Sequence, residues 1–402
     1  MSDPPLSDRP LSHLRVLTFG AFVAGNTAAL ILAELGMDVV KIESRVRPEA
    51  LRNNYFFDHP DAREPSGVPT TALYGGLARS VRSVSVELGA PGGPEVFRRL
   101  AAAADVVVEN FRPGVLDRFG CGYDDLRGVN PRLSMLSISG YGRTGRRSSY
   151  AAYATNISNH VGLSSAWGHT HGYHFDYVAG YHGALGVLAA LRQTETTGAG
   201  VHLDLAQVES GATTMMPILV EHLATGAEYQ RRDNVVPGSV LSAVVACAGA
   251  DRWLAVEAVD GADWKRLCAV LELRPTSDPS AADVEQAKTS LAEWAASRTP
   301  YQAAHLLQRA GVAAAPVQDA SDLARDPQLR ARGFIVEIDH PDLGRIEYPG
   351  AVERTVRPSG GVKGPVPRLG EHTRQVLADW AGMGKAEVAA LAERGAIWLP
   401  EQ

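Results

Sequence analysis

The sequence predicts an α/β protein in which a doubly wound, Rossmann-like large domain is combined with a smaller α+β domain. Residues 14–43 pass through apolar strand, glycine turn, helix and apolar strand, which is how such folds open. Two further apolar segments, 105–109 and 133–139, run into turns rich in glycine or polar residues. The pattern breaks near residue 225. We therefore expect the large domain to contain residues 1–224 and 321–402, and the small domain to contain residues 225–320.

The opening unit has well-marked boundaries. Leu14 to Phe19 reads as a buried strand, and a turn over residues 20–25 leads to a helix from Asn26 to Leu35, which Gly36 ends. Met37 to Glu43 is the second strand, with β-branched residues at its centre. No G-x-G-x-x-G follows the first strand, so the sequence has no fingerprint for a nicotinamide or flavin nucleotide.

The segment from Ser44 to about Ser80 is expected to be a long irregular connection, because it is rich in arginine, proline, asparagine and aspartate. Its Arg45, Arg47 and Arg52 suit two interpretations: they contact phosphate groups, or they belong to a solvated charged loop. A helix is then expected over residues 91–104.

A buried strand from Asp105 to Glu109 leads into the segment NFRPGVLDR, residues 110–118. In a parallel sheet, ligands bind where strands end at the carboxyl edge. An asparagine, an aromatic ring and two arginines at such a place suit an adenine ring and phosphate groups. An ordinary turn with Arg118 as a solvated charge is the alternative. The next strand, Leu133–Ser139, ends in Gly140-Tyr141-Gly142, where glycine allows close backbone approach.

Asp176 stands directly before a long segment of good helix formers with Leu185, Leu188 and Leu191 on one stripe. The segment ends at Gly198 and Gly200. An aspartate at this place is expected to be the helix N-cap. It is also placed to act as a nucleophile, because the helix opens with small residues that permit close approach. The two interpretations are compatible.

The remaining elements are assigned from their periodicity and turn signals. They are a strand over 201–205, a helix near 207–224, a linker over 225–238, a hairpin over 241–259, helices over 263–273, 281–297 and 299–310, a strand over 311–317 that returns to the large domain, short strands within 327–349, and C-terminal helices from residue 371 onward.

Composition limits the class of protein. A net charge of −6 argues against nucleic acid or an anionic membrane as the main partner. Three scattered cysteines do not form a disulfide framework, and no secretory signal or membrane-spanning run is visible, so a cytoplasmic enzyme is expected. The run H-x-H-x-x-H-x-D, His169 to Asp176, resembles a metal site, but it lacks H-E-x-x-H. We interpret its histidines as loop residues over the active site and expect no metal.

Several of these motifs resemble the class III CoA-transferases, the family of formyl-CoA transferase and carnitine CoA-transferase. The similarity lies in residues 14–43, in VENFRPGVLDRFG, in S-G-Y-G, in D-Y-x-x-G followed by an Ala/Leu-rich helix and T-G-x-G, and in LGEHT. It covers nearly the whole chain. Asn26 departs from the pattern, because the family usually has proline there, and the glycine-rich loop before the hairpin is reduced to Pro237-Gly238-Ser239.

The resemblance implies a substrate, a reaction and a set of site residues. The substrates are an acyl-CoA and a small carboxylic acid, and CoA passes between acids through aspartyl anhydride and aspartyl-CoA thioester intermediates. Asp176 is the implied nucleophile, with backbone N–H groups of its helix, Gly140 and Gly142 as candidate oxyanion donors. The CoA site is implied to contain Val23, Ala24, Asn110, Phe111, Arg118, Gly140 and Tyr141.

The resemblance also implies an interlocked homodimer and leaves alternatives open. One is an acyl-CoA racemase or an intramolecular CoA-transferring isomerase. Racemases have a histidine where this chain has Tyr153, and tyrosine is a poor proton shuttle at neutral pH. Another is a partner subunit of a two-chain CoA-transferase, which the presence of Asp176 argues against. A metal hydrolase is a more distant alternative.

Overall fold

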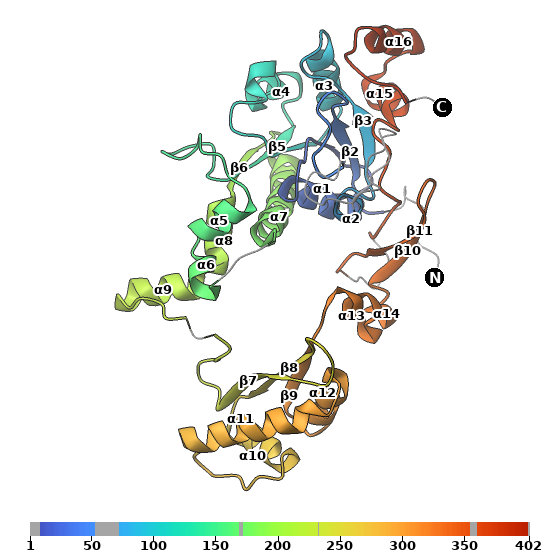
Figure 1. Cartoon of the computed structure of the whole chain (residues 1–402). Helices are drawn as coiled ribbons and strands as arrows, with labels where there is room; N and C mark the ends of the chain where they lie inside the picture. Colours follow the sequence, from blue (N-terminus) through green and yellow to red (C-terminus); the bar gives the residue numbers. More distant parts are fainter. Residues whose placement is uncertain (1–8, 53–71, 169–171, 232, 354–359, 401–402) are drawn as a thin grey trace. The chain divides into compact units, whose positions relative to one another are not determined.

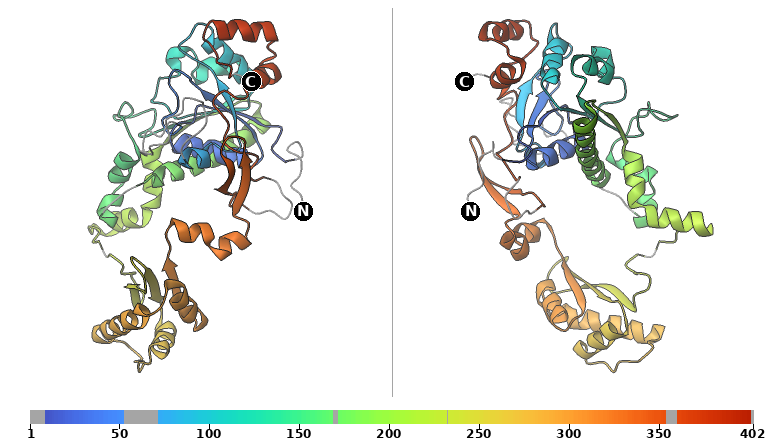
Figure 2. Two further views of the ribbon diagram at one scale, coloured as in Figure 1. Left: turned by 45° about the vertical axis from the view of Figure 1, so that its right-hand side comes forward. Right: turned by 180° about the vertical axis from the view of Figure 1, so that it is seen from behind.

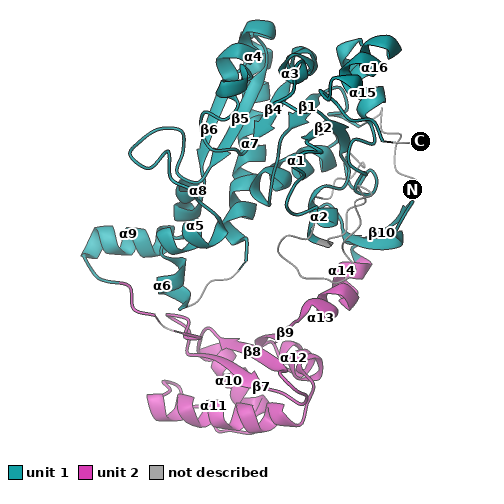
Figure 3. Cartoon of the chain, turned by 45° about the horizontal axis from the view of Figure 1, so that its top comes forward, with its two compact units in different colours: residues 1–228, 332–402 teal, residues 229–331 magenta. Residues whose placement is uncertain are grey.

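The computed structural model describes residues 9–52, 72–168, 172–231, 233–353 and 360–400. Contacts divide the chain into two compact units (Figure 3). The first contains residues 1–228 and 332–402, and the second contains residues 229–331. Within the described ranges, no helix is both long enough and apolar enough to cross a membrane.

The first unit is built on a six-stranded sheet whose pairings are all parallel (Figure 1). The strand order is β3-β2-β1-β4-β5-β6, which is the doubly wound order, so the predicted fold class is confirmed for this unit. The strands are β1 (Arg15–Thr18), β2 (Asp38–Glu43), β3 (Arg82–Ser85), β4 (Val106–Glu109), β5 (Ser134–Ser139) and β6 (His202–Ala206).

Strand β3 is an addition to the predicted elements. Its Ser83 and Ser85 are fully buried, so the apolar run typical of a buried strand is interrupted. Residues of the LGEHT motif itself form hydrogen bonds to this strand. The hydroxyl of Ser83 accepts from the N–H of Gly370 at 2.8 Å, and the N–H of Ser85 donates to Thr373 Oγ1 at 3.1 Å. The C-terminal segment is thereby fastened to the edge of the sheet.

Helices cover both faces of the sheet, with a separate apolar core under each (Figure 2). One core lies under α1 and α7, and the other lies under α3, α4, α15 and α16. The helices of this unit are α1 (Ala24–Glu34), α2 (Ala72–Leu77), α3 (Gly93–Ala102), α4 (Tyr123–Val129), α5 (Ala154–His160), α6 (Leu163–Trp167), α7 (His174–Thr197), α8 (Gln207–Thr214), α9 (Met216–Thr225), α15 (Thr373–Ala381) and α16 (Lys385–Glu393).

Two of the predicted helical and irregular segments differ from the structure. The single helix expected near 207–224 is broken into α8 and α9 at Met215, because Pro217 is favoured in the first turn of a new helix and cannot continue an old one. The connection expected over 44–80 contains α2, and its residues 53–71 lie outside the described ranges.

The second unit is a three-stranded antiparallel sheet, β7-β8-β9, packed on helices. The strand expected to return to the large domain is instead β9, which pairs with β8, so that prediction is wrong. Its short apolar run, AAAPV, fits a small sheet as well as a large one. The elements are β7 (Leu241–Ala246), β8 (Trp253–Ala258), β9 (Ala313–Val317), α10 (Gly261–Val270), α11 (Ala281–Ala296), α12 (Pro300–Arg309), α13 (Ala320–Arg325) and α14 (Pro327–Ala331). The first unit resumes with a hairpin of β10 (Ile335–His340) and β11 (Gly344–Pro349).

Close packing of α1 against α7 depends on two glycines of α7. A Cβ at Gly180 would lie 2.5 Å from Thr27 Cβ and 3.1 Å from the carbonyl oxygen of Ala24. A Cβ at Gly183 would lie 2.8 Å from Leu136 Cδ2 on the sheet. Gly180 contacts the start of α1, and the next turn of α7 contacts a later part of α1. The two helices therefore run in the same direction and begin at the same edge of the sheet.

We expect Gly180→Ala to destabilise the protein by about 1–3 kcal/mol, because the added methyl group forces α1 and α7 apart. Gly186→Ala is the matched control in the same helix. A Cβ at this position would contact only Leu203 Cδ1, at an ordinary van der Waals distance of 3.5 Å. The substitution should therefore stabilise α7 by up to about 1 kcal/mol. Urea unfolding of both variants measures the two effects. Equal effects of the two substitutions would contradict the proposed role of the contact.

Candidate active site at the carboxyl edge of the sheet

The strand order places a crevice between β1 and β4, where the chain continues to opposite sides of the sheet. The loop after β1 and the loop after β4 flank this crevice. Asn110 joins them directly. Its side-chain Oδ1 accepts from the N–H of Ala21 and its Nδ2 donates to the carbonyl oxygen of Ala21, both at 2.8 Å. Both polar atoms of the Asn110 side-chain amide are therefore used to hold the loop after β1.

The whole loop from Gly20 to Phe22 is held in the same way. Each backbone N–H and each carbonyl group of these three residues is hydrogen-bonded to a side chain. The side chains that do this in the described chain are Thr18, Asn26, Lys41, Glu49 and Asn110. Phe22 has a φ of 53°, which is uncommon for a residue with a side chain. The many bonds hold the loop in this conformation.

Asn26, the departure from the family pattern, belongs to a buried polar network. Its Oδ1 accepts from Lys41 Nζ at 2.7 Å, and its Nδ2 donates to the carbonyl oxygen of Phe22 at 2.5 Å. Lys41 also forms a buried ion pair with Glu49 at 2.9 Å. Proline has no side-chain donor or acceptor, so it could not make either bond of Asn26.

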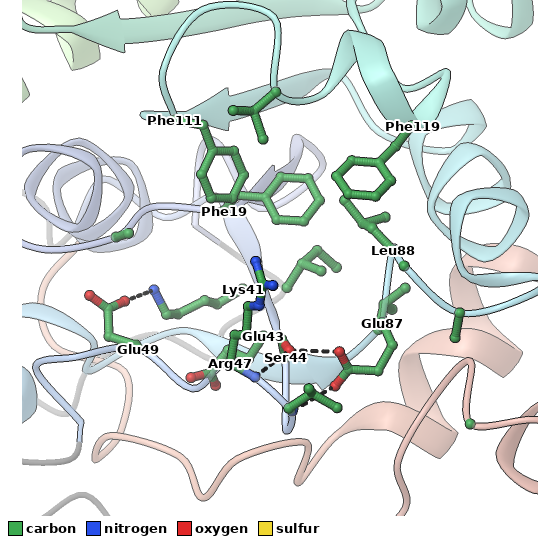
Figure 4. A pocket seen from close by; sticks show the side chains of 18 residues that line it. Phe19, Lys41, Glu43, Ser44, Arg47, Glu49, Glu87, Leu88, Phe111 and Phe119 are labelled. Carbon is green, nitrogen blue, oxygen red and sulfur yellow. Dashed lines mark hydrogen bonds and ion pairs between the residues drawn. The ribbon is translucent and has the colours of Figure 1, made fainter. Parts of the chain in front are cut away.

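A cavity of about 580 Å³ opens beside this loop, along the ends of β1, β2, β3 and β4. Figure 4 shows aromatic rings on one side of it and charged side chains on the other. Phe19, Phe111 and Phe119 form the aromatic side, and the ring centroids of Phe19 and Phe111 lie 5.5 Å apart. Phe111 lies at the cavity because its N–H donates to Glu109 Oε2 at 2.8 Å. Burial raises the pKa of Glu109 to about 7.

The three arginines of the segment after β2 have different surroundings. Arg52 is buried and forms a two-pronged ion pair with Glu43, at 3.0 and 2.9 Å, so neither the phosphate-contact nor the solvated-loop interpretation holds for it. The guanidinium carbon of Arg45 lies 5.0 Å from the ring centroid of Trp398. Arg47 is exposed and lines the cavity, where its charge can meet an anionic ligand.

Asp176 lies in the first turn of α7, beside the residue that directly follows β6 at the carboxyl edge of the sheet. The helix begins at His174 with Tyr173 as its N-cap, so the prediction that Asp176 is the N-cap is wrong. The carboxylate instead accepts a hydrogen bond at Oδ1 from Gln207 Nε2, at 2.7 Å. Gln207 begins α8 directly after β6.

Asp176 is 9% exposed, and this burial raises its pKa to about 6, even though the bond from Gln207 lowers it. Desolvation disfavours the ionised form of a carboxyl group and makes the remaining carboxylate a better nucleophile. Val23 and Ala24 lie at the start of α1. The first turn of α1 contacts Gly180, which lies one turn further along α7 than Asp176. The side chains of Val23 and Ala24 are buried in apolar cores, so only their backbone is free to meet a ligand.

The remaining predicted site residues lie on the loops after β4 and β5. Arg118 is exposed in a short 3-10 helix, Asp117–Phe119. Gly140 is required by packing, because a Cβ there would lie 2.2 Å from Ala152 Cβ. The ring of Tyr141 contacts Tyr150 and His160 edge-on, at 5.8 and 5.2 Å between centroids. The structure thus places Phe111 in the wall of the cavity and Asn110 next to it, holding the Gly20–Phe22 loop, whereas Arg118, Gly140 and Tyr141 lie on neighbouring loops.

Tyr153 and the histidine run complete the surroundings. Tyr153 precedes α5 and meets Phe22 edge-on, with centroids 5.8 Å apart. His174 is the first residue of α7, which corrects its assignment to a loop, and His169 and His171 lie outside the described ranges. Within those ranges no group of three metal-ligating side chains is found.

Gln207 and the network of Asn26, Lys41 and Glu49 were not predicted from the sequence. Gln207 carries a usable signal: it is a polar residue that directly follows a strand, in the same position relative to β6 as Asn110 has relative to β4. The network gives no local signal, because its members are separated along the chain and only the fold brings them together.

Comparison with known proteins identifies relatives along nearly the whole chain. The model of CoA-transferase family III matches residues 11–373. The succinyl-CoA–D-citramalate CoA-transferase of Chloroflexus aurantiacus is 29% identical over 97% of this chain and 98% of its own length. The beta subunit of that organism's succinyl-CoA–L-malate CoA-transferase is 30% identical over 96% and 98%. A CAIB/BAIF family protein from Brucella suis has the same fold, with a TM-score of 0.82 at 24% identity, covering 94% of this chain and all of that one.

Proposed function

Because the chain belongs to CoA-transferase family III and is a class III CoA-transferase, we propose that Asp176 is the residue that carries the acyl group and then CoA during transfer. The observation that supports this most directly is a buried carboxylate in the first turn of α7, at the carboxyl edge of the sheet, with a pKa raised to about 6. At neutral pH such a group is ionised and poorly solvated, which suits nucleophilic attack.

The transfer proceeds in steps that exchange one bond at a time. A carboxylate oxygen of Asp176 attacks the donor thioester carbon, the C–S bond breaks, and a mixed anhydride and CoA thiolate result. The thiolate attacks Cγ of Asp176, and the donor acid leaves. The acceptor carboxylate attacks the same Cγ and releases the thiolate, giving a second anhydride. Attack of the thiolate on its acyl carbon yields the new acyl-CoA and restores Asp176.

The cavity beside the Gly20–Phe22 loop is the proposed site of the CoA nucleotide. Phe111 offers an aromatic face for adenine, and Arg47 offers a charge for phosphate. Asn110 contributes by holding the loop, and Val23 and Ala24 contribute backbone at the start of α1. Arg118, Gly140 and Tyr141 remain proposed CoA-site residues, on the loops that follow β4 and β5.

The substrates are proposed from the relatives. Those named above act on succinyl-CoA with D-citramalate or L-malate. Succinyl-CoA is therefore the first donor to test, and hydroxylated dicarboxylic acids are the first acceptors. Transfer by the purified single chain would distinguish a complete enzyme from one subunit of a two-chain enzyme.

We expect Asp176→Asn to abolish both CoA transfer and the covalent adduct. Wild-type enzyme incubated with succinyl-CoA should gain the mass of CoA less water, and the adduct should map to the peptide that contains Asp176. The variant should gain nothing. More than a trace of turnover in the variant would remove Asp176 from the mechanism.

The same variant also tests the electrostatics. The native pKa of Asp176 exceeds its unfolded value of about 3.9. The unfolded state therefore loses its proton first, and stability falls as pH rises from about 4 to 6. Because asparagine cannot ionise, Asp176→Asn should stabilise the fold by about 1–3 kcal/mol at pH 7.5 and little at pH 4. Destabilisation at pH 7.5 would contradict the burial argument.

Turnover of the wild type should decline below about pH 6.

Arg47→Ala should raise the KM for succinyl-CoA about tenfold with a smaller effect on kcat, because a remote phosphate contact adds binding energy without touching the reacting atoms. Arg45→Ala is the matched control: it removes the same charge two residues away, from a side chain that packs on Trp398. A KM that rises equally in both variants would mean that Arg47 acts only through the general field of the surface.

We also propose that the enzyme is an interlocked homodimer. Apolar side chains stand exposed on one stripe of α9, at Met216, Leu219, Val220 and Leu223, and contiguous exposed apolar surface is typical of an interface. Interlocked chains have no stable folded monomer, so the unfolding midpoint should rise with protein concentration. Sedimentation of a folded, active monomer would refute the assembly.

A further inference from the structure

We propose that the side-chain amide of Gln207 is the oxyanion donor for the steps in which Asp176 is itself attacked. This inference rests on the proposed role of Asp176 and adds a second catalytic residue to it. Gln207 Nε2 donates to Asp176 Oδ1 at 2.7 Å. The two residues are 8% and 9% exposed, so the bond is shielded from water.

The fold holds this amide in place before any substrate arrives. Gln207 is the first residue of α8, and the N–H of the next residue, Val208, donates to the carbonyl oxygen of Gly140 at 3.0 Å. The hydroxyl of Ser210 donates to the backbone carbonyl of Gln207 at 3.0 Å. A Cβ at Gly211 would lie 3.1 Å from the ring of Phe175, so α8 is packed closely against the first turn of α7. A donor fixed in this way needs no reorganisation during the reaction.

The hydrogen bond makes the two oxygens of Asp176 unequal. Oδ1 is held by Gln207, whereas Oδ2 has no hydrogen-bond partner in the described part of the chain. Oδ2 is therefore the oxygen that attacks the donor thioester and becomes the bridging oxygen of the anhydride. Oδ1 remains the carbonyl oxygen of the aspartyl group, with the amide of Gln207 still pointing at it.

The chemistry of the next two steps develops negative charge at this oxygen. When the CoA thiolate attacks Cγ, the Cγ–S bond forms and the electron pair of the carbonyl moves onto Oδ1. The electron pair on Oδ1 then re-forms the Cγ–Oδ1 double bond as the Cγ–Oδ2 bond breaks, and Oδ2 leaves with the donor acid. The acceptor carboxylate then attacks the same carbon, charge again passes through Oδ1, and the thiolate leaves. One donor thus serves both additions.

The same bond does not assist the first attack, because there it stabilises the resting carboxylate. Removing it should therefore slow the attacks on Cγ and spare the formation of the first anhydride. An anhydride that waits longer for the thiolate is exposed longer to water. Loss of Gln207 is expected to divert turnover from transfer toward hydrolysis of the donor.

The experiment compares Gln207→Leu with the wild type, using succinyl-CoA as donor and L-malate as acceptor. We expect kcat for transfer to fall at least about 100-fold, with the KM for succinyl-CoA changed less than about threefold. The CoA adduct seen by mass spectrometry should diminish, and the ratio of hydrolysis to transfer should rise. Glu209→Gln is the control: it alters an exposed residue in the same turn of α8 and should leave all of these quantities unchanged.

A second variant keeps the proposal testable should Gln207→Leu fail to fold. In Gln207→Glu the introduced carboxyl can donate to Oδ1 only while it is protonated. Transfer by this variant should therefore decline toward alkaline pH, where the wild type does not. Normal kcat and an unchanged pH profile in the variants that fold, with Asp176→Asn inactive, would overturn the role of Gln207 alone. Turnover by Asp176→Asn would overturn the role of Asp176 and this inference with it.

Discussion

The contact between α1 and α7 is the constraint on which the rest of the large unit depends. It is possible because Gly180 and Gly183 present no side chain to α1 and to the sheet beneath. The helices begin at the same edge, so their amino termini, which favour negative charge, lie together where the strands end. Asp176 is thereby brought to the crevice by backbone packing. Substrate contacts are not needed to place it.

Much of the fold could be predicted because its core strands are continuous apolar runs. Residues 106–108 are all valine and fully buried, and the strand is unmistakable. Strand β3 could not be recognised, because two serines at buried positions find hydrogen-bond partners almost 300 residues away. The same limit applies to β9. A run of three alanines and a proline shows that a strand exists, and only the pairing partners show which sheet it joins.

The candidate site was predictable where a motif places residues directly after a strand, as with Asn110 and Phe111. It was not predictable where function depends on which groups pair after folding. Arg45, Arg47 and Arg52 look equivalent in sequence, yet one packs on Trp398, one lines the cavity and one is neutralised by Glu43. Burial in the ion pair with Glu43 sets Arg52 apart, and of the two exposed arginines, Arg45 and Arg47, it is Arg47 that lines the cavity. Asp176 was found from its motif and its helix, although its place within the first turn, three residues after the N-cap Tyr173, was not.

The loop from Gly20 to Phe22 has an evolutionary consequence. Its backbone is held by side chains that belong to β1, α1, β2, the segment after β2 and the segment after β4. The effect of changing any one of them must depend on the others. A proline in place of Asn26, for example, would remove a partner of Lys41 and a partner of Phe22 together, and Lys41 would then be left with Gly20 and Glu49 as its acceptors. Such positions are epistatic, and their substitutions are expected to accumulate in correlated sets during divergence of the family.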